Sequence, residues 1–171
     1  MILYTIMNNI LLLINSLFII IILIKFCLIN YVKIREHIYS NLSFDEKKNI
    51  IKKNFNLIKS KKIRLSKQHN NIYKQKPRDI IDKNLDLNFL TKVINIDLKN
   101  KTIHVEALIT YEKLLDYTLQ YGLIPQIVPE FKALTVGGTI SGVGLESSAF
   151  KYGLVPDMIY EFEVLTGTGD I

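Results

Sequence analysis

The first thirty residues and the rest of the chain differ in their pattern of hydrophobic and polar positions. From Ile10 to Tyr31, leucine and isoleucine follow one another with few interruptions, giving about 20 apolar residues, enough to cross a bilayer core as a helix. No basic residue precedes this span and no small-residue cleavage site follows it, which disfavours a cleaved signal peptide. The pattern therefore predicts a transmembrane anchor over residues 1–31, with a signal peptide or a buried core helix as the alternatives.

A helical pattern follows the apolar span. Ser43 and Glu46 have the spacing of a capping box. In this motif the side chain of the first residue accepts a hydrogen bond from the backbone N–H of the second, and the side chain of the second accepts one from the backbone N–H of the first. We predict a helix from Phe44 to about Ser60, within a basic juxtamembrane segment over residues 32–60. Its apolar face is made of Ile51, Phe55 and Ile58.

The next stretch, residues 61–92, is polar and is predicted to be irregular or looped, apart from a short strand at Ile63–Leu65. Alternation of apolar and polar positions then predicts a hairpin of two strands, Val93–Leu98 and Thr102–Glu106, joined by a turn at Lys99–Lys101. His104 lies between two apolar residues of its strand, so its side chain is expected to face solvent.

A second helix is predicted over Tyr111–Tyr121, capped by Thr110 and ended by Gly122 at the left-handed position. Its buried stripe is expected to be Leu114, Leu115, Thr118 and Leu119. The last alternating segment, Ile159–Leu165, predicts a strand that leads into a turn at Gly167–Asp170. Because such a turn normally leads to a partner strand, we expect the chain to be truncated relative to its fold, naturally or as a split gene.

Charge sharpens the prediction of a membrane anchor. The formal charge is +6, but residues 33–83 alone carry a net +10, and the remainder of the chain is acidic. A basic segment after an apolar span suits anionic lipid headgroups, and the positive-inside rule places residues 33–171 in the cytoplasm. A solvated helix face is the alternative explanation. Nucleic acid is not an expected partner, because the basic residues come without aromatic platforms or a recognised motif.

Cysteine and histidine usage narrows the chemistry further. The single cysteine, Cys27, lies in the apolar span, which excludes an intrachain disulfide and a cysteine-based metal site. The three histidines, His37, His69 and His104, are scattered without metal-ligand spacing, so no metal site is expected.

The stretch Thr135–Ser148 is the strongest candidate for chemistry. It holds four of the eight glycines in the chain, together with five hydroxyl residues. Glycine removes the Cβ that would block a close approach of the backbone to a ligand, and successive N–H groups in a turn suit phosphate oxygens. We therefore expect a turn in which the backbone binds an anionic ligand, with an ordinary surface turn as the alternative.

The neighbours of this stretch complete a recognisable set. The set consists of Val128-Pro129-Glu130-Phe131, Leu134–Gly138, Gly142–Ser148, Lys151-Tyr152-Gly153-Leu154 and Glu163-Val164-Leu165, with Arg64–Lys67, Ile96-Asp97, Val105-Glu106 and Thr110-Tyr111-Glu112 upstream. In order and spacing it resembles the FAD-binding half of the FAD-linked oxidoreductases of the vanillyl-alcohol-oxidase (PCMH-type) superfamily, and within it most resembles the Δ24-sterol reductase branch. The similarity spans roughly residues 61–171.

The resemblance implies an α+β PCMH-type FAD-binding domain, incomplete at its C-terminal end, over residues 61–171 behind the transmembrane helix. The residues that the resemblance assigns to FAD contact are Thr135, Val136, Gly137, Gly138, Thr139, Ser141, Gly142, Gly144 and Ser147. Many relatives carry an earlier glycine-rich loop with a histidine bonded to flavin. The matching region here, about Lys61–Tyr73, has no glycine, so FAD is expected to bind noncovalently and His69 is not expected to carry it.

The resemblance leaves the activity of this chain open. It implies a membrane-anchored flavoprotein that reduces a sterol side-chain double bond, with a nucleotide such as NADPH as electron donor. An oxidase of a small alcohol is a variant within the same superfamily. The other possibility is a truncated, non-catalytic remnant, or one half of a split flavoprotein that needs a separately encoded C-terminal half. No catalytic residue is assigned from the sequence.

Overall fold

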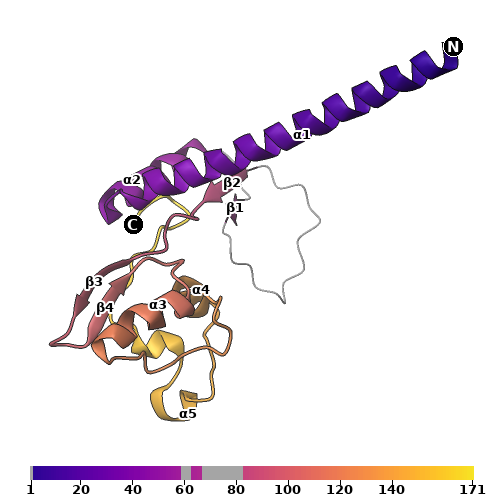
Figure 1. Ribbon diagram of the computed structural model, residues 1–171. Helices are drawn as coiled ribbons and strands as arrows, with labels where there is room; N and C mark the ends of the chain where they lie inside the picture. The colour runs from indigo at the N-terminus through magenta and orange to yellow at the C-terminus, as the bar shows by residue number, and fades with distance from the viewer. Residues whose placement is uncertain (1, 59–62, 67–82) are drawn as a thin grey trace. The chain divides into compact units, whose positions relative to one another are not determined.

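The chain divides into two compact units, Met1–Leu42 and Ser43–Ile171, in the computed structural model. The structure describes residues 2–58, 63–66 and 83–171. The first unit is one helix, α1 (Ile2–Ser40), which Figure 1 shows as continuous and which runs past Tyr31, the predicted end of the anchor. The second unit contains the remaining helices and strands of the described residues.

The apolar part of α1 presents its side chains outward on every side. Within the described residues, one helix is long and apolar enough to cross a membrane, Ile14–Ser40 of α1, and none of its most apolar window is buried. A helix that is hydrophobic all round needs an apolar surrounding, and a bilayer core supplies one. Length and composition are thus consistent with the predicted association with a membrane.

The second unit opens with α2 (Phe44–Leu57), and its predicted capping box is confirmed. The Ser43 side chain accepts a hydrogen bond from the Glu46 N–H at 3.3 Å, while the Ser43 N–H donates to the Glu46 carboxylate at 2.8 Å. That backbone donor lowers the pKa of Glu46, because it stabilises the ionised carboxylate. The helix ends at Leu57, three residues before the predicted end.

Of the two short strands that follow α2, the first was predicted and the second was not. The strand β1 (Ile63–Ser66) is confirmed, but it pairs in parallel with β2 (Lys83–Asp86), in a region predicted to be irregular or looped. The sequence of β2, Lys-Asn-Leu-Asp, has little intrinsic preference for a strand. Leu85 is its buried member, and long-range packing against α2 accounts for the strand where local pattern does not.

The predicted hairpin is confirmed. The strands β3 (Val93–Asp97) and β4 (Thr102–Val105) pair antiparallel, with a register shift between Val93 and Asn95. Asp97 fixes the turn by accepting hydrogen bonds from the N–H groups of Lys99 and Asn100 at 2.9 and 3.1 Å. His104 is exposed, as predicted, and lies edge-on to the Phe44 ring with centroids 5.4 Å apart.

The helix after the hairpin begins and ends as predicted, although its buried face differs. Thr110 caps α3 (Tyr111–Thr118), which continues as the 3-10 turn η1 (Leu119–Tyr121), and Gly122 has a left-handed φ of 67°. The predicted burial of Leu119 is wrong, because the switch to a 3-10 turn rotates this residue outward and leaves it 56% exposed. Tyr111, which the prediction left out, is fully buried instead.

Two hydrophobic clusters hold the second unit together. The first is built on Ile51, Leu85, Leu90 and Leu108, and the second on Ile109, Tyr111, Leu114 and Val136. A buried ion pair reinforces the first, since the Lys47 ammonium lies 2.6 Å from the Glu106 carboxylate and both side chains are at most 2% exposed. Lys47 also donates to the Phe89 carbonyl, and the Lys92 N–H donates to Glu106, so both charges are compensated within the protein.

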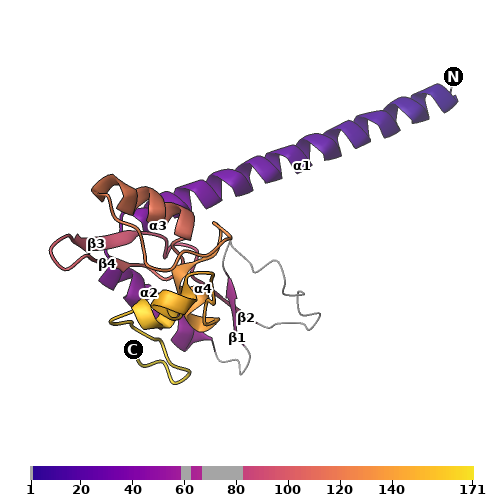
Figure 2. The same cartoon turned by 90° about the horizontal axis from the view of Figure 1, so that it is seen from below.

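The C-terminal third consists of three short helical turns and an extended end (Figure 2). The turns are α4 (Val136–Ser141), α5 (Ala149–Tyr152) and the 3-10 turn η2 (Val155–Met158). The predicted strand at Ile159–Leu165 is wrong: the segment has a bend at Tyr160 and no regular secondary structure, and it pairs with no other segment among the described residues. The sequence alternates between apolar and polar residues here, but no hydrogen-bonded neighbour that would make the segment a strand lies among the described residues.

Candidate functional site around the glycine-rich segment

The first half of the glycine-rich segment is a helix rather than the predicted open turn. Thr135 is the N-cap of α4, and Gly137 and Gly138 lie in its first turn. A helix leaves its first four N–H groups without partners inside the helix. Here three of those groups, on residues 136–138, have a partner within the protein, and the Thr139 N–H makes the first bond of the helix itself, so none of these four is free to bind a ligand.

The partners come mainly from the strand-like segment that leads into α3. The Val136 N–H donates to the Ile109 carbonyl at 3.1 Å, and the Gly137 N–H donates to the Ala107 carbonyl at 2.7 Å. The bridge between Thr110 and Thr135 continues this antiparallel contact. The remaining two donors bind Thr135 itself, one through its hydroxyl and one through its carbonyl. This bonding fixes the start of α4 against the entry to α3.

The close approach of the two segments explains the glycines of α4 by packing. A Cβ built on Gly137 would lie 3.0 Å from both the Cβ and the carbonyl oxygen of Ala107. A Cβ on Gly138 would lie 2.9 Å from the capping hydroxyl of Thr135. The absence of a side chain at these positions therefore serves the contact between protein segments, whatever else binds nearby.

A buried pair of hydroxyl groups locks α4 to α3. The Thr139 hydroxyl donates to the Val136 carbonyl at 2.9 Å, which leaves the Tyr111 hydroxyl as the donor in the 3.1 Å bond between the two side chains. Burial raises the pKa of Tyr111, and the negative charge of Glu146 raises it further, so this phenol stays protonated.

The second half of the segment, which we call the exit loop (residues 143–148), has the opposite character. Among the described residues, no N–H group of the exit loop donates a hydrogen bond. Gly142 has φ −104° and ψ 13°, and Val143 follows with a left-handed φ of 71°, an order that turns successive N–H groups toward one side. A left-handed β-branched residue is uncommon and marks local strain, which is typical of functional loops.

Gly144 allows the exit loop to pack against Val155 at the start of η2. It has a left-handed φ of 57°, and a Cβ there would lie 2.5 Å from the Cγ2 of Val155. Val155 is fully buried at the start of η2. The conformation and the contact both require glycine, so the exit loop has a fixed shape, although its N–H groups donate to no acceptor among the described residues.

The nine residues predicted to contact FAD therefore fall into two groups. Thr135, Val136 and Thr139 are buried, and Gly137 is half-buried against Ala107. Gly138, Ser141, Gly142 and Ser147 are exposed, and Gly144 is half-buried. The Ser141 hydroxyl already donates to the Gly137 carbonyl at 2.8 Å, whereas the Ser147 hydroxyl has no protein partner among the described residues. Contact of these residues with FAD stays a prediction, best supported by geometry at the exit loop.

Three side chains in the exit loop or directly after it were not predicted to contact FAD. Leu145 is 75% exposed and Phe150 is 91% exposed, which is unusual for apolar side chains of this size. Lys151 follows, with its ammonium 5.0 Å from the Tyr152 ring centroid. An apolar surface beside a cation suits a ligand that joins an aromatic ring to a phosphate. Local sequence gives no signal that separates such residues from core positions.

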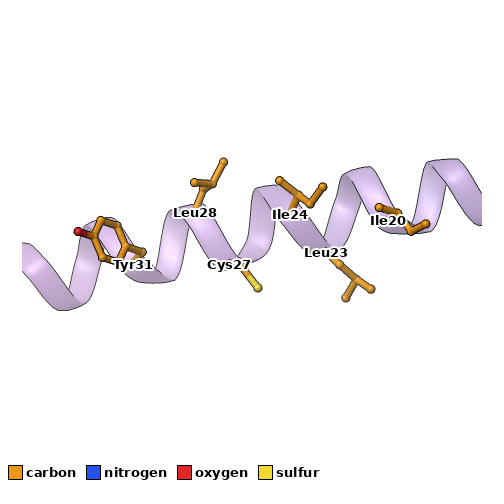
Figure 3. A pocket seen from close by; sticks show the side chains of 6 residues that line it. All are labelled: Ile20, Leu23, Ile24, Cys27, Leu28 and Tyr31. Atoms are coloured by element: carbon orange, nitrogen blue, oxygen red, sulfur yellow. The ribbon is translucent and has the colours of Figure 1, made fainter.

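The remaining candidates are His69, a metal site and a hollow on α1. His69 and most of Lys61–Tyr73 lie outside the described residues. The described residues contain no group of three or more His, Cys, Asp or Glu side chains that could hold a metal ion. Figure 3 shows a hollow along α1, lined by Ile20, Leu23, Ile24, Cys27, Leu28 and Tyr31, which all come from this one helix. Its lining is almost wholly apolar and forms the surface of the helix.

The comparisons with known proteins identify the class to which this site belongs. The sequence model of a protein family described as "FAD binding domain" matches residues 65–171. This part of the second unit contains the hairpin, α3, α4 and the exit loop. The chain belongs to this family of PCMH-type FAD-binding domains, and the predicted fold class is confirmed. No solved structure matches the chain significantly.

The curated relatives narrow the family resemblance. The chain is 34% identical over 61 residues to a Delta(24)-sterol reductase homolog of Caenorhabditis elegans, a match that covers 36% of this chain and 12% of the relative. It is 36% identical over 67 residues to the Delta(24)-sterol reductase of Homo sapiens, covering 39% of this chain and 13% of the relative. The match thus spans about an eighth of the length of these curated relatives, and it confirms the predicted resemblance to that branch.

Gly144 offers a test of the fixed shape of the exit loop. We expect Gly144→Ala to lower the free energy of unfolding by about 2–4 kcal/mol, because alanine resists the left-handed backbone and its Cβ collides with Val155. Urea unfolding of the full chain in detergent micelles, followed by circular dichroism, measures this change. Gly167→Ala is the matched control, since no atom lies within 4 Å of a Cβ built there.

The double variant Gly144→Ala/Val155→Ala separates collision from backbone strain. Removing the two methyl groups of Val155 relieves the closest contact, at 2.5 Å to Cγ2, and leaves the one at 2.9 Å to Cβ, so the double variant should be less destabilised than the sum of the single variants. Equal stability of Gly144→Ala and Gly167→Ala would contradict the described packing of the loop.

Proposed function

We propose that this chain is the FAD-binding part of a membrane-associated oxidoreductase related to the sterol reductases, which reduces a sterol side-chain double bond. The observation that carries the proposal is the coincidence of the family match with the exit loop, whose backbone donors have no acceptor among the residues that the structure describes. When bound, the flavin supplies the hydride chemistry, and the residues of this chain bind and orient it.

The residues of the exit loop fit the pyrophosphate end of FAD. The consecutive N–H groups that begin at Val143 supply donors, the free Ser147 hydroxyl adds another, and Lys151 supplies positive charge. Glu146 belongs to the exit loop, but its negative charge repels phosphate, so we assign it no phosphate contact. Leu145 and Phe150 offer apolar surface for a ring of the cofactor.

We further propose that FAD is held noncovalently. Within residues 43–58, 63–66 and 83–171, the only histidine is His104, which lies on β4 with its ring against Phe44. A histidine bonded to flavin would have to stand beside the cofactor, and this ring faces the start of α2 instead. The proposed electron donor is a reduced nicotinamide nucleotide such as NADPH.

The membrane proposal is that α1 spans the bilayer once and leaves Ser43–Ile171 on the cytoplasmic side. It is supported by the apolar surface of α1 and by the basic residues that follow it. The exposed lysines Lys52 and Lys53 on α2 continue this positive charge into the second unit, where anionic lipid headgroups are a suitable partner.

Two other functions from the same family are weighed against this one. An oxidase of a small alcohol would use the same FAD site with O₂ as acceptor. A non-catalytic remnant, or one half of a split flavoprotein, would keep the FAD site without a substrate site. Because the match covers 12–13% of the sterol-reductase relatives, the proposal assigns FAD binding to this chain and catalysis to the complete oxidoreductase.

FAD titration of the full chain in detergent tests the proposal. We expect FAD to bind with quenching of its fluorescence, FMN to bind more weakly, and acid precipitation to release all the flavin into solution. Ser147→Ala should weaken FAD binding about two- to tenfold, the value of one hydrogen bond. The matched control Ser148→Ala should change it little, because that hydroxyl already donates to the Gln126 carbonyl at 3.4 Å.

Loss of the flavin absorbance in the absence of oxygen separates a reductase from an oxidase. NADPH should bleach the flavin of a reductase, whereas a small alcohol should bleach the flavin of an oxidase. Absence of any FAD binding would refute the cofactor proposal, and binding without bleaching by either reductant would favour the non-catalytic form.

Protease accessibility in sealed membrane vesicles tests the orientation. With a tag after Ile171 and the cytoplasmic face outward, we expect the tag to be cleaved without detergent, because positive charges after the span hold the second unit on that side. Replacing Lys33 and Arg35 by glutamate should weaken this preference. A tag that is cleaved only after the vesicles are opened would place the second unit on the other side.

A further inference from the structure

Asn15 is a polar residue in the most apolar part of α1. Its side chain is exposed and makes no hydrogen bond among the described residues, whereas the neighbouring Ser16 has an interaction partner. Only isoleucine, leucine and phenylalanine occupy residues 17–24, and the protein buries none of the most apolar window of the helix. A primary amide carries donors and an acceptor, and hydrocarbon offers a partner to neither. In a bilayer, the Asn15 amide therefore needs a partner from another molecule.

Asn15 lies inside the hydrocarbon core for either natural end of the crossing. A helix needs about 20 residues to cross that core. If the crossing ends at Ile24, before Lys25, then Asn15 lies near its middle. If it ends five residues later, at Ile29, then Asn15 still lies about 7 Å inside it. Asparagine has a short side chain that does not reach the headgroups from this depth, unlike the long side chain of Lys25.

Asn15 also begins a row of residues that has the spacing of helix pairing. Steps of four, three, four and three residues lead from Asn15 to Ile19, Ile22, Phe26 and Ile29, and we call these five residues the Asn15 seam. A mean step of 3.5 residues keeps them on one side of two helices that wind around each other with a left-handed supercoil, the usual packing of membrane helices. All five side chains are exposed on α1.

The amide indicates which partner fits the seam. With the proposed single crossing, all copies of the chain cross the membrane in the same direction, so two copies lie parallel and each seam residue faces its counterpart. Asn15 then faces Asn15, and each amide can donate to the oxygen of the other. An asparagine at one position of an apolar seam fixes the register and the number of paired helices. A lipid tail against the seam would leave both amides without partners.

The charges near the seam are compatible with two parallel copies. Lys25 occupies a flanking position of the repeat, so the ammonium groups of the two copies do not lie directly opposite each other. Lys33 is the next member of the row, four residues beyond Ile29, and lies where anionic headgroups offset its charge.

We propose that two copies of this chain associate in the membrane through the Asn15 seam, with their Asn15 amides hydrogen-bonded to each other between the two helices. The inference rests on the proposed crossing of the membrane by α1. It does not depend on FAD binding, which belongs to the second unit.

Energy transfer between donor-labelled and acceptor-labelled copies of the full chain in phosphatidylcholine vesicles tests the proposal. We expect more transfer than randomly distributed chains give. Asn15→Leu should weaken the association about five- to thirtyfold, the value of an interhelical polar contact in model membrane helices. Asn15→Gln keeps an amide and should preserve most of it. Asn30→Leu is the matched control and should change it little, because this residue lies outside the seam.

Cysteine cross-linking locates the interface on α1. The native Cys27 follows Asn15 by twelve residues, which places it about 120° around the helix, so the unchanged chain should form little disulfide-linked dimer on oxidation. In a Cys27→Ser background, Ile22→Cys on the seam should cross-link efficiently. The matched variant Ile24→Cys, on the opposite side of the helix, should not.

Random transfer for the unchanged chain, equal transfer for Asn15→Leu and Asn30→Leu, or equal cross-linking through Ile22→Cys and Ile24→Cys would overturn the pairing. Washing the vesicles with alkaline carbonate shows which proposal has failed. A chain that is washed off contradicts the membrane crossing together with the pairing, whereas a chain that stays in the vesicles as a monomer contradicts the pairing alone.

Discussion

The antiparallel contact between the start of α4 and the entry to α3 determines most of what this unit can do. The two hydrogen bonds from Val136 and Gly137 to the carbonyls of Ile109 and Ala107 bring two backbones together at a distance that excludes a side chain on Gly137. They also use the donors at the start of α4, the first place at which a glycine-rich segment would be expected to bind phosphate. Ligand binding is thereby shifted along the chain to the exit loop.

The position of Ala107 depends in turn on a buried pair of charges. Glu106 follows β4 directly, and its carboxylate is held by Lys47 of α2 at 2.6 Å. Removing one member of such a pair leaves an uncompensated buried charge, which is far more costly than losing a surface pair. The basic helix α2 is therefore part of the folding unit that supports the glycine-rich segment, and the family match, which begins at residue 65, does not include it.

Local sequence signals predicted the features that depend on near neighbours. The capping box at Ser43, the hairpin, and the two ends of α3 were all correct, because each is set by residues within a few positions of one another. The helix in the glycine-rich segment and the strand β2 could not be predicted in this way, since their partners lie far away in sequence. The alternation of Ile159–Leu165 was real, but a pattern cannot supply the neighbouring strand.

For the candidate site, the resemblance pointed to one segment, and the structure divides the residues of that segment by their contacts within the protein. The glycines were attributed to ligand approach, whereas Gly137 and Gly144 are required by contacts with Ala107 and Val155. Such contacts are invisible without the fold. The claim that remains is that the exit loop, rather than the start of α4, faces the cofactor.

Amide hydrogen exchange of the full chain with and without saturating FAD tests this claim most directly. The account predicts that the amides of residues 136–139 exchange slowly in both states, because all four are hydrogen-bonded, and that those of residues 143–148 exchange quickly alone and slowly with FAD. Fast exchange at residues 136–139 that FAD suppresses, with no change at residues 143–148, would contradict it.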